Sequence, residues 1–296
     1  VMIKRGNSEN VCHRHFVFYS LTVAQQMTNQ VSPPNWTGPK GRLIWKQLSR
    51  LARTKFSRPL FYLVTRFTVE RVSVIKVEQV EFKLAAVNPR LDMRNRTYAK
   101  KEPETLRWIE SFDEGSVLWD IGANIGLYSL YAAKVRNCKV VAFEPSVFCL
   151  EFLARNIWLN GLHEQITIVP NALSDTTQAN LLTLYSREWG ESSNSFGTTL
   201  DQDGNEIDAS FNYKILGITM DEALTKFHLP EPQHIKIDVD GIEPTILAGG
   251  TQLLKRVQSV SVEVPTYRGA NAQVAEILSS AGLKLTQDVG NQVWRR

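Results

Sequence analysis

The sequence of 296 residues has few cysteines and no apolar run long enough to cross a membrane. Its three cysteines, Cys12, Cys138 and Cys149, are too scattered for a disulfide framework, and none forms a C-x-x-C pair that would indicate zinc. No stretch reaches the roughly 18 apolar residues of a spanning helix. None of the five histidines forms a pair at metal-ligand spacing. We therefore expect a cytoplasmic protein with no transmembrane segment and no bound metal.

Acidic residues are scarce in one part of the chain. The formal net charge is only +4, yet the stretch from Lys40 to Lys76 holds ten Lys or Arg residues and a single acid, Glu70. Within it, residues 42–56 repeat apolar side chains at helical spacing with basic side chains between them, which predicts an amphipathic basic helix. We favour packing of this helix on the main domain. The alternatives are contact with an anionic membrane surface through Arg42 to Arg58, or with nucleic acid.

The chain divides into three predicted segments. Residues 1–37 precede the first clear helical pattern and are expected to form a loose leader. Residues 38–102 hold the basic helix and two alternating or β-branched stretches, Thr68 to Val77 and Val80 to Leu84, which predict a small antiparallel β cap. Residues 103–296 are expected to form the main domain.

From Pro103 onward, strand patterns alternate with helix patterns. The predicted strands are VLWDI, KVVAF, ITIVP, HIKIDV and SVSVEV. Such alternation predicts an α/β fold, with a doubly wound parallel sheet covered by helices on both faces. Ligands of these sheets bind beyond the carboxyl ends of the strands. The residues that end the strands are therefore the candidates for a site: Asp120, Glu144, Asn171, Asp238 and Glu263.

The stretch DIGANIG, residues 120–126, lies where a predicted strand turns into a helix. Gly122 and Gly126 allow a sharp turn and close approach of a ligand, and the helix that follows offers unpaired N–H groups. Glu144 ends the next strand, where an acid can accept both hydroxyls of a ribose. Together these features predict an adenosine-containing cofactor; the alternative is an ordinary turn with a solvated glutamate.

The dinucleotide pattern G-x-G-x-x-G is broken at two places. Asn124 stands where the pattern requires glycine, and Leu127 stands at the place of its third glycine. NAD is therefore disfavoured. S-adenosyl-L-methionine has no pyrophosphate, so a backbone that does not enclose phosphates suits it better.

Several longer motifs occur in the same order: WDIGANIGLYSLYAA, VAFEPSVFCLEFLARNIWLNGL, IVPNALSD and HIKIDVDGIEPTILAGGTQLL. Over roughly residues 103 to 265 the chain resembles the FkbM-type family of S-adenosylmethionine-dependent methyltransferases. The resemblance implies a seven-stranded Rossmann-like sheet and methylation of a hydroxyl on a sugar, a polyketide or a related small molecule. This chain has Asp240 where the family usually has glutamate.

The resemblance also implies roles for individual residues of the cofactor site. In the family pattern, the loop beside the methionine part of the cofactor corresponds to Asp120, Gly122, Asn124 and Gly126. Glu144 corresponds to the ribose-binding acid. Asn171 and Ala172 correspond to the residues beside the adenine.

Methylation of a hydroxyl benefits from a base, and a carboxylate at a strand end can serve as one. Asp238 is our candidate for that base, or for an acid that orients the cofactor, with Lys236 beside it lowering its pKa; the alternative is a purely structural ion pair between Lys236 and a carboxylate. We expect Glu243 to anchor the substrate or the loop; the alternative for Glu243 is an ordinary helix start before Pro244. A metal held by Asp238, Asp240 and Glu263 is a further alternative, which we disfavour because no spacing rule requires it.

Two other functions compete with a small-molecule or glycan methyltransferase. A nucleic-acid methyltransferase would explain the basic segment, but the Asn/Asp-Pro-Pro-aromatic tetrad of base-amino methylating enzymes is replaced here by DVDG. A non-catalytic module of the same fold would use the basic helix to dock on a partner or an anionic surface. Residues 186–213, rich in Ser, Gly, Asn and Asp, are expected to form a long loop that acts as a lid.

Overall fold

The computed structural model describes residues 43–44, 46–47, 58–186, 188–190, 192, 194–206, 208–209 and 211–296. It divides into two compact units, Val1–Val69 and Glu70–Arg296. The predicted leader lies outside the described residues. So does most of the predicted basic helix, of which Leu43, Ile44, Lys46 and Gln47 are helical.

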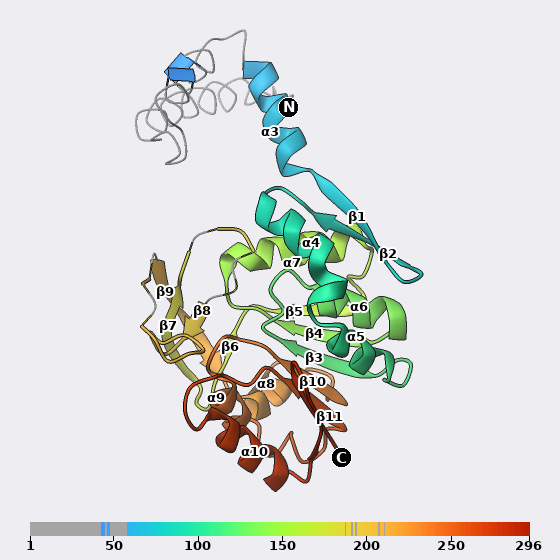
Figure 1. Cartoon of the computed structure of the whole chain (residues 1–296), viewed down its shortest axis with the longest axis vertical. Coiled ribbons are helices and arrows are strands. Elements are labelled where there is room, and N and C mark those ends of the chain that lie inside the picture. The colour runs from blue at the N-terminus through green and yellow to red at the C-terminus, as the bar shows by residue number, and fades with distance from the viewer. Residues whose placement is uncertain are drawn as a thin grey trace, which may run out of the picture. The chain divides into compact units, whose positions relative to one another are not determined.

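The second unit is built on a seven-stranded sheet with the order β12-β13-β11-β10-β3-β4-β5 (Figure 1). Five neighbouring strands, from β11 to β5, are parallel, and β13 runs antiparallel to both β11 and β12. The sheet confirms the predicted α/β fold with a mostly parallel sheet. Its strands are β3 (Val117–Ile121), β4 (Lys139–Phe143), β5 (Ile166–Val169), β10 (His234–Ile237), β11 (Ser259–Val262), β12 (Lys284–Asp288) and β13 (Gln292–Arg295).

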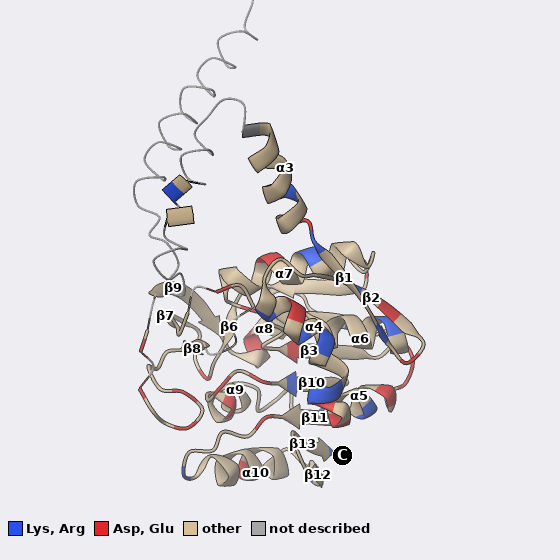
Figure 2. Ribbon diagram, turned by 45° about the horizontal axis from the view of Figure 1, so that its top comes forward, with Lys and Arg blue, Asp and Glu red and all other residues tan. Residues whose placement is uncertain are grey.

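Helices cover both faces of this sheet because successive side chains of a strand point to opposite sides. Trp119 and Ile121 of β3 pack in one core cluster with residues of α8 (Met220–Lys226), α9 (Glu243–Ala248) and α10 (Ala270–Ser280). Leu118 packs in the other cluster with residues of α5 (Pro103–Glu110), α6 (Leu127–Arg136) and α7 (Val147–Leu159). Both views show the sheet between these two layers (Figures 1 and 2).

An antiparallel hairpin of β1 (Val72–Val77) and β2 (Val80–Ala85) matches the predicted β cap. Its first strand is shorter than predicted, because α3 (Arg58–Val69) continues through Thr68 and Val69. Phe82 and Leu84 of the hairpin pack in the same core cluster as α5 and α6. The unit Glu70–Arg296 therefore includes this hairpin, and the expected division at residues 102 and 103 stays a prediction.

Several elements were not predicted from the sequence, among them α3, α8, β12 and β13, and two further ones matter for the cavity described below. One is α4 (Pro89–Lys101), which follows the hairpin. The other is a four-stranded sheet with the order β6-β9-β7-β8. Its strands are β6 (Ala172–Leu173), β7 (Gln178–Leu184), β8 (Asn194–Phe196) and β9 (Phe211–Ile218). Strand β8 lies inside the expected long loop of residues 186–213, and β9 begins there, so this stretch is only partly a loop.

Candidate active site

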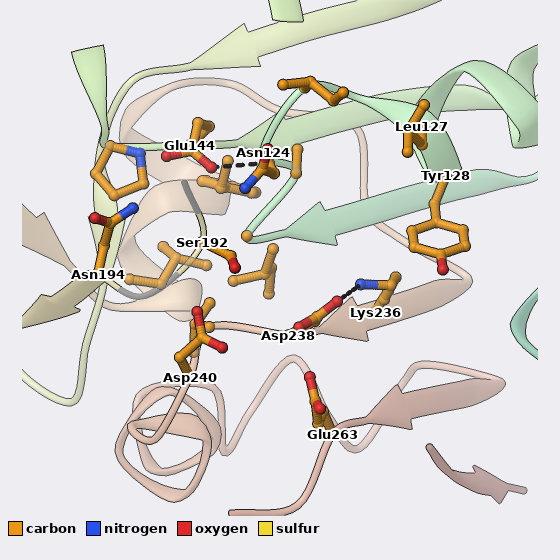
Figure 3. Close-up of a pocket in the computed structure, with 18 of the residues that line it drawn as sticks. Asn124, Leu127, Tyr128, Glu144, Ser192, Asn194, Lys236, Asp238, Asp240 and Glu263 are labelled. Atoms are coloured by element: carbon orange, nitrogen blue, oxygen red, sulfur yellow. Dashed lines mark hydrogen bonds and ion pairs between the residues drawn. The ribbon is translucent and has the colours of Figure 1, made fainter. Parts of the chain in front are cut away.

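A cavity of about 400 Å³ lies at the carboxyl ends of the central strands (Figure 3). Its size is within the range of about 300 to 1,000 Å³ that is usual for small-molecule sites. The loops after β3, β4, β10 and β11 each contribute to its wall, through Asn124, Glu144, Asp238 and Glu263 respectively. The parallel sheet thus gathers polar side chains from distant parts of the chain at one edge, as its topology requires.

The loop after β3 is pressed against the neighbouring strand ends. The N–H groups of Gly122 and Ala123 both donate to the carbonyl of Phe143, each at 3.0 Å. Gly122 has φ of +79°, and a Cβ atom there would lie 1.9 Å from the carbonyl oxygen of Asp238. Only glycine therefore fits between β3 and β10, and its backbone forms part of the cavity wall.

Gly126 does not line the cavity but is the N-cap residue of α6, with φ of +86°. A Cβ atom at this position would lie 2.6 Å from Cδ1 of Leu153 in α7. The second glycine of the loop therefore allows α6 to approach α7 closely. Gly126 therefore contributes to the packing of the two helices and not to the cavity wall.

Glu144 is buried at the end of β4 and holds two loops together. Its Oε2 accepts a hydrogen bond from the Asn124 N–H at 2.8 Å, and its Oε1 accepts one from the Ser146 N–H at 2.7 Å. Burial raises the pKa of Glu144 to about 7, although these two N–H groups oppose the rise. A carboxylate has about four lone-pair sites. The acceptor sites that these two N–H groups leave on the carboxylate fit the two hydroxyls of a ribose, so Glu144 suits an adenosyl group.

Asn171 and Ala172 also line the cavity, beside the four-stranded sheet. The Asn171 side chain donates to the carbonyl of Leu216 in β9 at 3.1 Å. Ala172 is buried and pairs with Gly217 of the same strand. The unpredicted sheet therefore positions both residues.

Asp120 is buried behind the cavity and does not line it. It accepts a hydrogen bond from the hydroxyl of Ser129 at 2.5 Å. Burial raises its pKa, and the nearby Lys236 ammonium opposes that rise. Asp120 thus belongs to the electrostatic surroundings of Lys236.

Lys236 of β10 is fully buried and is the cation nearest to Asp238. Its Nζ donates to Oδ2 of Asp238 at 2.6 Å and lies 4.7 Å from the ring centroid of Tyr128 (Figure 3). Burial lowers the pKa of Lys236, but the carboxylates of Asp238 and Asp120 raise it by more. The lysine is therefore charged and holds the Asp238 side chain in place.

Asp238 and Glu263 share a hydrogen bond across the ends of β10 and β11. Burial would raise the pKa of Asp238, but the Lys236 ammonium lowers it below its usual range. The hydrogen bond to Asp238, together with burial, raises the pKa of Glu263. The two carboxyl groups therefore titrate as a pair, in which the Lys236 ammonium favours the negative charge on Asp238.

Asp240 and Glu243 belong to the turn after β10 but face different surroundings. Asp240 lines the cavity with a left-handed backbone, φ of +62°. Burial, followed by the charges of Asp238 and Glu243, raises its pKa to about 7. Glu243 does not line the cavity. Its carboxylate accepts hydrogen bonds from the Val239 N–H at 3.1 Å and the Gly241 N–H at 3.0 Å, so it holds the turn that carries Asp240.

Other lining residues were not predicted from the sequence. The α4 helix supplies Arg94 and Lys101, while Glu102 and Tyr128 come from the starts of α5 and α6. Tyr128 directly follows the glycine loop and could have been suspected from that position. Asn88 followed by Pro89 is a typical helix start and could have indicated α4, but nothing in the sequence shows which face of α4 meets the cavity.

Within the ranges that the structure describes, no three His, Cys, Asp or Glu side chains are placed to share a metal ion. The carboxylates of the cavity instead form hydrogen bonds or ion pairs with lysine or backbone N–H groups, or lie beside one another.

A model of the methyltransferase FkbM domain matches residues 120–285, which is more than half of the chain. The hexuronic acid methyltransferase AglP of Haloferax volcanii is 28% identical over 208 residues, covering 66% of this chain and 77% of that protein. Methyltransferase sdnD of Sordaria araneosa is 26% identical over 207 residues, covering 61% and 78%. Among solved structures, M. jannaschii TYW2 in complex with AdoMet is similar over 76% of this chain and 86% of that one, with 12% identity and a TM-score of 0.38.

Proposed function

The chain belongs to the FkbM methyltransferase family, and we propose that it transfers the methyl group of S-adenosyl-L-methionine to a hydroxyl oxygen of a sugar or a similar small molecule. The observation that carries this proposal is the single cavity that joins the glycine loop and Glu144 to the ionised Asp238. A cofactor-binding half and a proton-accepting half thus face the same space. The name of the Haloferax volcanii relative, a hexuronic acid methyltransferase, supports a sugar as the acceptor.

The cofactor half consists of five of the lining residues. We propose that the loop of Gly122 and Asn124 binds the methionine end, that Glu144 accepts the ribose hydroxyls, and that Asn171 and Ala172 contact the adenine. When bound, S-adenosyl-L-methionine supplies an activated methyl group. Asp120 and Gly126 act from behind this half as positioning residues, through Lys236 and through the packing of α6.

The acceptor half is proposed to centre on Asp238. Its carboxylate, kept ionised by Lys236, would accept a hydrogen bond from the acceptor hydroxyl and then its proton, as the oxygen takes the methyl group and S-adenosylhomocysteine is left. Alignment by this hydrogen bond is as important as proton transfer, because well-oriented reactants reach effective concentrations of about 10⁵ to 10⁸ M. Glu243 is a positioning residue in this scheme, since its carboxylate holds the turn beside Asp238.

A cation on α4 favours an acceptor that itself carries a negative charge. Arg94 and Lys101 both line the cavity, but the Lys101 ammonium already pairs with Glu102 at 3.2 Å. The Arg94 guanidinium donates to the hydroxyl of Ser192 at 2.9 Å, which leaves its other N–H groups for a carboxylate. This supports a hexuronic acid ahead of a neutral hexose.

Methyl transfer to defined acceptors tests the proposal. The full chain would be incubated with methyl-labelled S-adenosyl-L-methionine and with glucuronic acid, galacturonic acid or glucose, each free and as a phenyl glycoside. We expect S-adenosylhomocysteine release and a methyl ether on a hexuronic acid. An ether withstands mild alkali, whereas a methyl ester is hydrolysed. Label found only as an ester, on nitrogen or in nucleic acid would contradict O-methylation of a sugar hydroxyl.

A further inference from the structure

A second cavity, of about 850 Å³, adjoins the candidate active site. Lys101, Glu102 and Glu263 line both cavities. Glu263 shares a hydrogen bond with Asp238, and in Figure 3 Glu263 and Glu144 lie on opposite sides of Asp238. None of the five residues proposed for the cofactor half lines the second cavity. The second cavity therefore lies beside the acceptor half of the active site.

The charges in the wall of the second cavity indicate which ligands it suits. Among the described residues its acids outnumber its cations by four to two: Glu102, Glu104, Glu263 and Asp288 against Lys101 and Arg268. Lys101 already pairs with Glu102, with Nζ 3.2 Å from Oε1. Phosphate groups would meet repulsion from these carboxylates. A neutral ligand with many hydroxyl groups suits the wall better, because carboxylates accept hydrogen bonds from hydroxyls.

Buried side chains hold two of these acids in place. Glu102 accepts hydrogen bonds at Oε2 from the Asn291 amide at 3.2 Å and from the Thr105 hydroxyl at 3.3 Å. Gln292, 5% exposed, donates from Nε2 to Oδ1 of Asp288 at 2.8 Å. Glu102 is thus a fixed part of the wall that both cavities share. Asp288 is held by one N–H group and keeps further acceptor sites for a ligand.

Tyr267 adds a partly buried aromatic ring to the same wall. A pyranose ring carries hydroxyl groups at its edge and C–H groups on its faces. An aromatic side chain packs on apolar faces of this kind, while carboxylate and amide groups bind the hydroxyls. The wall therefore combines the two kinds of contact that a sugar unit needs.

The size of the active-site cavity limits how much of an acceptor it can enclose. Its volume is about 400 Å³, and under the proposed function the cofactor occupies part of that volume. An acceptor longer than one sugar unit must therefore extend out of the active-site cavity. The second cavity adjoins the acceptor half, where such an extension would begin.

We propose that the second cavity binds the neutral sugar units of an oligosaccharide whose terminal hexuronic acid occupies the acceptor half of the active site. This inference rests on the proposed function and narrows the acceptor from a free sugar to a glycan chain. The acids of the wall decide against a nucleoside diphosphate sugar, because its two phosphates would lie next to them.

Acceptors of increasing length test the proposal with the full chain. Phenyl glucuronide would be compared with a disaccharide and a trisaccharide in which glucuronic acid is the terminal, non-reducing unit and the other units are glucose. We expect kcat/KM to rise at least about tenfold from phenyl glucuronide to the trisaccharide, because several added hydrogen bonds to charged groups strengthen binding. The gain should come mainly from KM, since these contacts are remote from the reacting oxygen. UDP-glucuronic acid should give a lower kcat/KM than the trisaccharide.

A matched pair of variants locates the effect. Ala272 and Gln273 are neighbouring exposed residues in the first turn of α10, but only Ala272 lines the second cavity. Ala272→Trp should remove the gain, so that kcat/KM with the trisaccharide falls to about the value with phenyl glucuronide. Gln273→Trp should keep the gain. Calorimetric titration with S-adenosylhomocysteine checks that both variants are folded.

Three kinetic outcomes would overturn the second cavity's role and leave O-methylation of a sugar standing. These are equal kcat/KM for phenyl glucuronide and both saccharides, equal proportional losses with the short and the long acceptor in Ala272→Trp, and a higher kcat/KM with UDP-glucuronic acid than with the trisaccharide.

If no sugar is methylated, the proposed function fails, and binding tests the cavity by itself. Saturation-transfer NMR would be recorded on the protein with S-adenosylhomocysteine and the trisaccharide. Signals from the glucose units that Ala272→Trp abolishes and Gln273→Trp keeps would support the second cavity as a sugar site. Their absence from the unchanged protein would contradict it.

Discussion

Glu144 is the acidic residue of the proposed cofactor half of the cavity. It is 5% exposed, and its two oxygens tie Asn124 and Ser146 together at the ends of β3 and β4. A buried carboxylate with a pKa raised to about 7 is stabilised when hydroxyl groups donate to its charged form. Its proposed role as a ligand is therefore compatible with its role in holding the two loops together.

Replacing Glu144 with Ala should weaken S-adenosylhomocysteine binding roughly ten- to hundredfold, because hydrogen bonds to a charged group contribute about 1.5 to 3 kcal/mol. Calorimetric titration gives the dissociation constant. Glu164→Ala, a change at a glutamate whose side chain is 85% exposed, is the control and should bind as the unchanged protein does. Equal affinities for the two variants would remove Glu144 from the cofactor site.

Asp238 should matter for turnover more than for cofactor binding. The variant Asp238→Asn keeps the shape of the side chain but cannot take a proton, and we expect kcat to fall by about 10² to 10⁴. Its dissociation constant for S-adenosylhomocysteine should change only a few-fold. Steady-state rates with the accepted sugar and calorimetry measure the two quantities.

The variant Asp240→Asn is the comparison for Asp238→Asn in the kinetic experiment. Asp240 lines the same cavity, and burial raises its pKa to about 7. If Asp238 is the base, Asp240→Asn should affect KM more than kcat. A larger loss of kcat in Asp240→Asn than in Asp238→Asn would transfer the role of base to Asp240.

The loop after β3 was the most predictable part of the site, and its two glycines turned out to differ. Both have positive φ, but Gly122 is limited by the backbone of β10 and Gly126 by a side chain of α7. The pattern DIGANIG shows that both must be glycine. It does not show which one faces the ligand, since that depends on elements far away in the sequence.

Gly122→Ala and Gly115→Ala form a matched pair for the loop. Both glycines have φ of +79°, so both variants carry the same backbone strain, but a Cβ atom at Gly115 meets nothing within 4 Å. A Cβ atom at Gly122 would lie 1.9 Å from the carbonyl oxygen of Asp238. We expect Gly122→Ala to be less stable than Gly115→Ala by about 1 to 3 kcal/mol or more, and to lose cofactor binding. Chemical denaturation and calorimetry would show this, and identical behaviour of the two variants would contradict the close approach.

Helix α4 shows why an element of the site was missed. Its start is ordinary: Asn88 accepts a hydrogen bond from the Leu91 N–H at 2.7 Å, and Pro89 occupies the first turn. Only Leu91, Asn95 and Tyr98 are buried along its 13 residues. With so few buried positions, apolar residues do not recur clearly at helical spacing. The sequence therefore did not predict a helix packed on the core at this segment. The cations that α4 brings to the cavity could not be assigned for the same reason.

At the level of the whole Glu70–Arg296 unit, the two ends of the sheet have opposite characters. The carboxyl ends carry the charged cavity, while His234 at the start of β10 is buried among aromatic rings. Its ring stacks on Phe112 with centroids 3.6 Å apart, and its Nδ1 lies 2.8 Å from the hydroxyl of Ser259. Burial lowers the pKa of His234 to about 4, so the imidazole is neutral in the folded protein.

This buried histidine makes the stability of the unit depend on pH. The pKa of His234 is about 4 when folded and 6.5 for the free side chain, so the unfolded chain binds the proton more readily. Its stabilising effect is complete above about pH 6.5 and declines as pH falls toward 4, by up to about 3 kcal/mol.

The measurement is the free energy of unfolding at several pH values for the unchanged protein and for His234→Gln. Raised carboxyl pKa values, such as that of Glu144, act in the opposite direction over the same pH range, but they cancel in the difference between the two proteins. We expect that difference to shrink from pH 7 to pH 4.5. His163→Gln, at a side chain that is 70% exposed, should show no such change.

Local patterns in the chain were sufficient to predict the alternating strands and helices, the glycine turn and the acids that end the strands. These depend on periodicity, on backbone geometry and on the rule that parallel strands end at one edge. The three-dimensional fold was needed to show that Arg94, Tyr128 and Glu263 meet in one cavity, and that Asp120 and Glu243 stand behind it. Contacts between distant segments, and the burial that shifts the pKa values of their carboxyl groups, arise from packing, and no local pattern encodes packing.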